Sequence, residues 1–279
     1  MIQTHTSRAA VLAKLVRFER PELSLPYAGG MDAATRAAVF GATLDEYDTA
    51  VGELAQRRDA AVQRLAQRDD VREILADPPF AAGQTVVAIG ESTTADRESW
   101  FELIGALFAV ERPDLGLRFV NLAVSGSTTT QLLGGLGMLR RVDPSIVFCM
   151  IGANDARRTG GSHAARLVSA EETRRNLALI RDAAAGTPRV WLAPVPVDED
   201  AIARYPYFGG AGIHWTEHDR SDTARAIADV AATDPVIDPV DAEHPIALLD
   251  DGVHPSADGQ FEIAVHVLRT LGAGGVPRL

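Results

Sequence analysis

The sequence predicts an α/β protein whose parallel sheet is covered by helices on both faces and preceded by an N-terminal helical region. Two observations lead to this prediction. Residues 1–77 read as helical, and from residue 84 short apolar runs alternate with helical patterns. Parallel strands need long crossover connections, so such alternation is typical of βαβ units. We therefore expect two parts, an N-terminal helical extension over residues 1–80 and an α/β domain over residues 81–279.

The clearest helix of the N-terminal part begins at Thr43, where the sequence TLDE fits a capping box with Glu46. Gly52 weakens the pattern, Arg58 interrupts it, and residues 77–80 (DPPF) end it. Its apolar side has to be covered by the rest of the chain or by a second copy, which would make a homo-oligomer. The apolar positions are Leu44, Tyr47, Val51, Leu54, Ala61 and Leu65.

The second part carries five apolar runs that predict the strands of the sheet. They are TVVAIG (85–90), RFVNLAVSG (118–126), SIVFCMIG (145–152), RVWLAPVPV (189–197) and PVIDPV (235–240). Helical patterns separate and follow them, at 97–110, 127–141, 169–185, 219–232 and from Phe261 onward.

Composition narrows the function before any motif is considered. The chain has 279 residues, a net charge of −11 and 46% hydrophobic residues, which argues against nucleic acid or an anionic membrane as its main partner. Cys149 is the only cysteine, so an intrachain disulfide and a cysteine-built metal site are excluded. The sequence shows no signal-peptide pattern and no apolar segment long enough for a membrane span. We expect a cytoplasmic protein.

Polar residues follow the predicted strands at the edge where parallel sheets bind ligands. Ser92 follows the first strand and precedes a helix, where a hydroxyl can act as a nucleophile if an imidazole takes its proton. Asp251 and His254 lie three residues apart in a loop and supply that imidazole with an orienting carboxylate. Attack creates an oxyanion, for which the Gly126 N–H and the Asn154 amide are candidate donors.

Four short blocks in this order resemble those of the SGNH hydrolases, also called GDSL esterases/lipases. They are IGES (89–92), NLAVSG (121–126), GAND (152–155) and DGVHP (251–255). The resemblance covers roughly residues 84–272 and implies a three-layer α/β/α sandwich of the flavodoxin-like kind. It implies Ser92 as nucleophile, Asp251 and His254 as the rest of the triad, and Ser92, Gly126 and Asn154 as the oxyanion hole. The family usually has GDS where this chain has GES, a change that could alter the hydrogen bonds orienting the nucleophile.

Two other patterns compete with parts of this interpretation. Asp241 and His244 repeat the D-x-x-H-P spacing, and we favour His254 because its copy has the Gly252 turn and leads directly into the SADGQ helix start seen in the family. The sequence HWTEH matches the H-x-x-E-H motif, which predicts a zinc metallohydrolase through His214, Glu217 and His218. Against it, the preceding glycines place His214 before the helix, and Glu243 is the one candidate for a third ligand.

We expect a serine ester hydrolase that acts on a small-molecule ester through an acyl-enzyme and needs no metal or organic cofactor. The class includes carboxylesterases, lipase-like enzymes and acetylesterases. An acyltransferase using the same triad and a non-catalytic scaffold remain alternatives. Aromatic residues after the fourth strand either line an acyl or alcohol pocket or contribute to packing; they are Tyr205, Tyr207, Phe208 and Trp215.

Overall fold

The centre of the molecule is a five-stranded, wholly parallel sheet with the strand order β2-β1-β3-β6-β8. We describe it from a computed structural model, in which residues 7–25, 30–160 and 164–273 are described. The order is that of a flavodoxin-like sheet, and it confirms the predicted fold class. The strands are β1 (Thr85–Gly90), β2 (Arg118–Asn121), β3 (Ile146–Met150), β6 (Arg189–Leu192) and β8 (Val236–Ile237).

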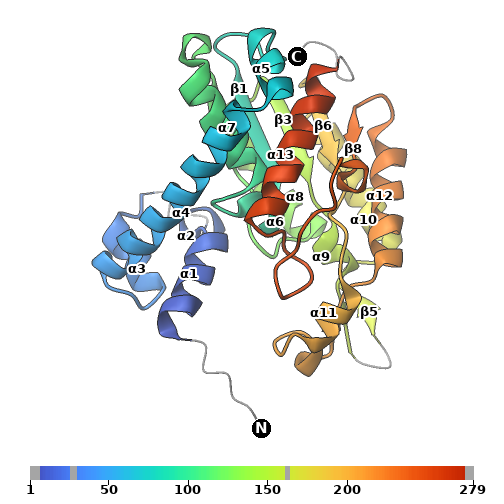
Figure 1. Ribbon diagram of the computed structural model, residues 1–279. Coiled ribbons are helices and arrows are strands. Elements are labelled where there is room, and N and C mark those ends of the chain that lie inside the picture. The colour runs from blue at the N-terminus through green and yellow to red at the C-terminus, as the bar shows by residue number, and fades with distance from the viewer. Residues whose placement is uncertain (1–6, 26–29, 161–163, 274–279) are drawn as a thin grey trace.

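Helices cover both faces of this sheet, as Figure 1 shows. One face packs against α4 (Leu44–Ala66), α5 (Asp69–Ala76), α7 (Trp100–Glu111) and α13 (Ala257–Gly272). The other packs against α8 (Thr129–Val142), α10 (Ala170–Ala183) and α12 (Glu217–Ala231). Alternate residues of each strand face opposite layers, so Val86 and Ala88 join the first core while Val87 and Ile89 join the second.

Several strands are shorter than the apolar runs that predict them. β2 ends at Asn121, and the run continues as a loop to Gly126, whose φ is 76°. β6 ends at Leu192, shortly before Pro194, because proline has no N–H to donate to a neighbouring strand. The ends of the apolar runs therefore form loops at the carboxyl edge of the sheet.

The N-terminal region is helical, as predicted, and contains α1 (Arg8–Phe18), α2 (Pro21–Ser24) and α3 (Ala33–Val39) before α4. The capping box is confirmed, because Thr43 and Glu46 each accept the other's backbone N–H. Side chains of α1, α3 and the first half of α4 form a small hydrophobic cluster of their own. The second half of α4 and α5 belong to the core of the sheet. The division of the chain at residue 80 stays a prediction, and one core is built from both sides of it.

Several short elements were not predicted from the sequence, and most of them lie around the carboxyl edge of the sheet. A small antiparallel sheet has the order β5-β4-β7, and two-residue strands of this kind are too short to show a period. The short elements are α6 (Ser92–Ala95), α9 (Ala153–Ala156), α11 (Glu199–Arg204), β4 (Arg158–Thr159), β5 (Ala165–Arg166), β7 (Ile213–His214) and 3₁₀ turns at Pro113–Leu115, Gly209–Ala211 and Pro239–Asp241.

None of the helices in the described part of the chain has both the length and the apolar character that crossing a membrane requires.

Candidate active site

Ser92 lies at the point where β1 ends and the short helix α6 begins. Gly90 makes this exit possible, because a Cβ atom there would lie 2.3 Å from the carbonyl oxygen of Met150 on the neighbouring strand β3. Only glycine lets the two strands approach this closely just before the turn. The side chain of Ser92 is buried, with 8% of its surface exposed, at the carboxyl edge of the sheet.

His254 and Asp251 come from the loop that precedes α13, and they meet Ser92 there. Ser92 Oγ lies 3.0 Å from His254 Nε2, and His254 Nδ1 lies 2.9 Å from Asp251 Oδ2. In the tautomer that fits these partners, Ser92 donates to the imidazole and the imidazole donates to the carboxylate. The structure thus brings together the three side chains that the sequence proposed as a triad, although 162 positions separate Ser92 from His254.

The loop itself fixes the position of the carboxylate. Asp251 Oδ1 accepts the backbone N–H groups of Val253 and His254, at 3.1 and 2.9 Å. Gly252 has a φ of 71°, and a Cβ there would lie 2.6 Å from the carbonyl oxygen of Asp198. Burial alone would raise the pKa of Asp251, but the hydrogen bonds and charge of His254 and the charge of Lys14 outweigh it and hold the pKa below its usual range. The carboxylate is therefore ionised.

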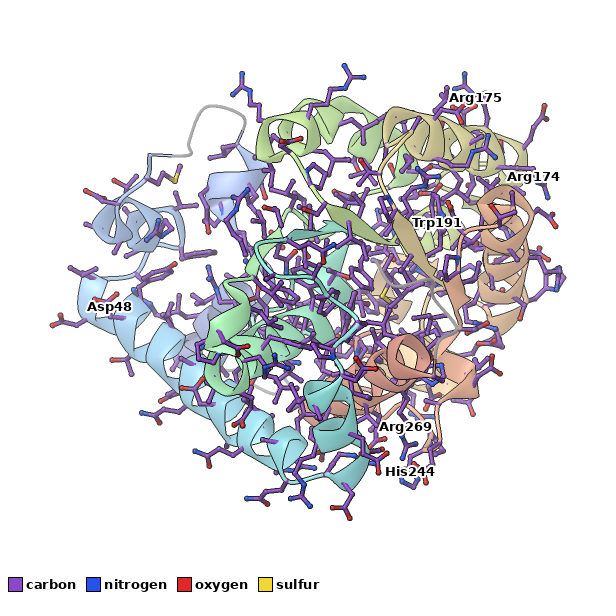
Figure 2. The ribbon with its side chains drawn as sticks, turned by 90° about the horizontal axis from the view of Figure 1, so that it is seen from above. Asp48, Arg174, Arg175, Trp191, His244 and Arg269 are labelled. Carbon is purple, nitrogen blue, oxygen red and sulfur yellow. The ribbon has the colours of Figure 1, made fainter. Side chains whose placement is uncertain are left out.

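His244, the alternative imidazole of the repeated spacing, lies elsewhere. Its side chain is exposed in the loop before α13, near Arg269, and Figure 2 shows it at the surface of the molecule. Among the described residues, the imidazole that contacts Ser92 is that of His254.

The two other predicted oxyanion residues lie in loops at the same edge. Asn154 is in α9 directly after β3, and its Nδ2 donates to Glu91 Oε2 at 2.9 Å and to the carbonyl oxygen of Ser127 at 3.2 Å. Gly126 lies in the turn between β2 and α8 with its backbone exposed. Since β1 and β3 are neighbours in the sheet, Ser92 and Asn154 lie just beyond the carboxyl ends of adjacent strands.

Glu91, the residue that departs from the family pattern, contacts Asn154. Its side chain is buried and accepts the backbone N–H groups of Ala153 and Asn154, at 3.1 and 3.2 Å, as well as the Asn154 side chain. Burial raises the pKa of Glu91 to about 8, against the opposing effect of these donors. The Glu91 carboxyl group is therefore largely neutral at pH 7, and it accepts from the Asn154 amide without placing a negative charge next to that amide.

Replacing Glu91 with glutamine should change how stability depends on pH. A carboxyl group whose pKa rises on folding stabilises the protein below its unfolded value, near 4.5, and loses that contribution as pH rises through about 8. The free energy of unfolding of the wild type should therefore fall between pH 5 and 8 more steeply than that of Glu91→Gln. One pKa unit is worth about 1.4 kcal/mol, so urea titrations at each pH resolve the difference. Parallel curves for the two proteins would show that Glu91 is ionised throughout.

Helix α1 forms one wall of the site, a role that the sequence did not reveal. Lys14 Nζ donates to Asp251 Oδ2 at 3.1 Å, and the ring of Phe18 lies 4.8 Å from that of His254. Arg17 donates to both oxygens of Asp96 and to the carbonyl oxygen of Pro255. The carboxyl edge of the sheet, marked by α6 and α9, is the end on which α1 and α11 lie in Figure 1. No local pattern around residues 14–18 signals these contacts with residues far along the chain.

A cleft of about 1530 Å³ opens beside His254, between α1 and the segment around α11. It is larger than the roughly 300–1,000 Å³ typical of small-ligand pockets. Tyr205, Tyr207 and Phe208 line it, whereas Trp215 is buried and donates to the carbonyl oxygen of Ala153. The other apolar residues that line it are Ala10, Val11, Leu15, Phe18, Ala201, Pro206, Ile246, Leu248 and Leu249.

The H-x-x-E-H residues do not share a helix face. His214 is in β7, whereas α12 begins at Glu217, so the two imidazoles belong to different elements. Glu217 pairs with Arg220, and the exposed His218 lies 3.5 Å from Asp222. Within the described ranges, no three or more His, Cys, Asp or Glu side chains are grouped as a metal site requires. The sequence motif therefore does not produce the geometry on which the zinc interpretation depends.

Comparison with protein families finds a match over most of the chain. The profile of the GDSL-like Lipase/Acylhydrolase family matches residues 88–260, a span that contains Ser92, Asn154, Asp251 and His254. A search of curated proteins finds no match.

Solved structures resemble the chain at low sequence identity. An α/β hydrolase, LAE5, from the metagenome of Lake Arreo, Spain, has a TM-score of 0.54 at 22% identity, covering 70% of this chain and 97% of its own. An acetyl xylan esterase, Axe2, from Geobacillus stearothermophilus has a TM-score of 0.53 at 19% identity, covering 70% of this chain and 97% of its own. The lipase/acylhydrolase from Enterococcus faecalis has a TM-score of 0.53 at 19% identity, covering 68% of this chain and 96% of its own. At these identities the likeness shows the fold.

Proposed function

The chain belongs to the GDSL-like lipase/acylhydrolase family and is a hydrolase acting on esters, and from that premise we propose that it cleaves carboxylic esters through an acyl-enzyme on Ser92. The observation that carries the proposal is the continuous series of contacts from Ser92 Oγ through His254 to Asp251. A serine hydroxyl becomes nucleophilic when a neutral imidazole accepts its proton, and the carboxylate holds that imidazole in the required tautomer.

In the first half of the proposed reaction, Ser92 Oγ attacks the ester carbonyl carbon while its proton moves to His254 Nε2. The carbonyl oxygen becomes an oxyanion, which the backbone N–H groups of Ser92 and Gly126 stabilise. The Asn154 amide also stabilises it, by exchanging its hydrogen bond to the Ser127 carbonyl oxygen for one to the oxyanion. The tetrahedral intermediate collapses, His254 returns the proton to the leaving alcohol, and the acyl group stays on Ser92. Water activated by His254 then releases the acid and restores the serine.

The cleft beside His254 supports a substrate with an apolar portion. Aromatic and aliphatic side chains line it, together with charged ones, which are Lys14, Glu19, Asp198, Arg204 and Asp250. Its apolar portions favour burial of an acyl or alcohol group that water solvates poorly. Structural relatives are described as an acetyl xylan esterase and as a lipase/acylhydrolase. We propose small-molecule esters with a short acyl chain and an alcohol portion that occupies this cleft.

Labelling with a fluorophosphonate tests the reaction class directly. We expect one covalent adduct, located on Ser92 by peptide mass spectrometry, with loss of esterase activity in proportion to labelling. The Ser92→Ala variant is the matched control and should stay unlabelled. A folded wild-type protein that does not react would support the scaffold alternative. A panel of p-nitrophenyl esters from acetate to decanoate then measures acyl preference.

A further inference from the structure

Lys14 contacts the same carboxylate oxygen that His254 uses. Its Nζ donates to Asp251 Oδ2 at 3.1 Å and to the Tyr205 hydroxyl at 2.8 Å, while His254 Nδ1 donates to that same Oδ2 at 2.9 Å. The other oxygen, Oδ1, already accepts two backbone N–H groups of the loop. Asp251 therefore keeps its position without Lys14, and what Lys14 adds is a positive charge next to the imidazole.

The position of Lys14 is fixed by the helix that carries it. Arg97, five residues after Ser92, donates its backbone N–H to the carbonyl oxygen of Arg17 and its Nε to that of Val16. Arg17 in turn donates to Asp96 and to the carbonyl oxygen of Pro255, next to His254. Helix α1 is thus held both to the segment after the nucleophile and to the catalytic loop.

We propose that Lys14 acts on the triad through Asp251 by its charge, which opposes protonation of His254 and so extends turnover to lower pH. The inference rests on the proposed function. A general base works only as neutral imidazole, so a nearby cation that disfavours imidazolium keeps more of the enzyme active in acid. Asp251 alone has the opposite effect, because an isolated carboxylate favours imidazolium.

Lys14 and Asp251 are both charged where they meet. The Tyr205 hydrogen bond and the charge of Asp251 outweigh the effect of burial and raise the pKa of Lys14. The side chain of Lys14 is 44% exposed, so solvent weakens its field without removing it. The other charged or titratable groups at the site are Arg17 on α1, Glu19 just after it, Asp96 after α6, Asp198 before α11, Arg204 and Tyr205 at its end, and Asp250 in the catalytic loop.

The pH profile of kcat/KM tests the inference with a neutral and a charge-conserving variant. For Lys14→Met we expect the acid limb of the profile to move by about 0.5–1 pH unit to higher pH. On that limb kcat/KM should fall about three- to tenfold, while its plateau value at higher pH keeps its order of magnitude. Lys14→Arg keeps the positive charge and should stay near the wild-type profile. Arg8→Met removes one positive charge from the same helix at a side chain that is 72% exposed, and should leave the limb unchanged.

Chemical modification gives a second test, because Lys14 is the only lysine in the sequence. An amine-selective acetylating reagent neutralises Lys14 and the amino terminus, and it should shift the acid limb of the wild type as Lys14→Met does. Lys14→Arg treated with the same reagent controls for the amino terminus and should not shift.

The outcomes separate this inference from the proposed function. Fluorophosphonate reactivity at Ser92 together with superimposable pH profiles for wild type and Lys14→Met would overturn the role of Lys14 and leave the esterase intact. No reaction at Ser92 in the folded wild type would overturn both. A loss in Lys14→Met that is equal at every pH would show that the residue acts on substrate binding or structure instead.

Discussion

Replacing Ser92 with alanine is expected to lower kcat by about 10⁴–10⁶-fold, the range found when one member of such a triad is changed. The change removes one oxygen, which contacts His254 Nε2 at 3.0 Å, and leaves the backbone turn after β1 in place. The melting temperature should therefore move little. His254→Ala should lose a similar factor, because the serine proton then has no acceptor. Initial rates with a p-nitrophenyl ester measure both variants.

Two further variants make this result specific. His244→Ala removes the exposed imidazole of the repeated spacing and should keep wild-type turnover. The Ser92→Ala/His254→Ala double variant should lose no more than either single variant, since residues that act as one unit are strongly non-additive. Equal losses from His244→Ala and His254→Ala, or multiplying losses in the double variant, would contradict the assigned roles.

The sequence predicts the central sheet and the residues at its carboxyl edge because their signals are local. Buried parallel strands are continuous apolar runs, and the residue after such a run lies at the ligand-binding edge by topology alone. The choice of His254 over His244 also has a local basis in the Gly252 turn. A Cβ at Gly252 would contact the backbone of Asp198, so the glycine is required by the packing of that loop.

The contacts that complete the site have no local signal. Lys14 and Asp251 are separated by 237 positions, and helical spacing in α1 does not say which distant loop its charged side chains meet. Glu91 shows a second limit. Its place beside Ser92 suggests an effect on the nucleophile, but its carboxyl group reaches across to Asn154, which follows the neighbouring strand β3. Side-chain direction at a strand end depends on the tertiary structure.

The buried ion pair that attaches α1 should be costly to break. Arg17 and Asp96 form a bidentate ion pair, in which Nε donates to Oδ1 at 3.0 Å and Nη2 donates to Oδ2 at 2.7 Å. Their side chains are 13% and 0% exposed. Asp96 also accepts from the Glu98 N–H and from Gln260, so it stays in place when Arg17 is lost. Removing one partner of a buried pair leaves an uncompensated charge, which typically costs about 3–5 kcal/mol.

Arg17→Met should therefore lower the free energy of unfolding by about 3–5 kcal/mol and, because α1 carries Lys14 and Phe18 to the catalytic loop, lower kcat/KM as well. Urea unfolding followed by two probes measures the stability, and coincident transitions show that the whole chain unfolds together.

Arg8→Met, on the same helix but largely exposed, should cost no more than about 0.5 kcal/mol. Arg17→Met/Asp96→Asn removes the uncompensated charge and should recover part of the loss. If Arg17→Met lowers the free energy of unfolding as little as Arg8→Met and keeps full activity, the contacts of α1 with the site contribute neither to stability nor to catalysis.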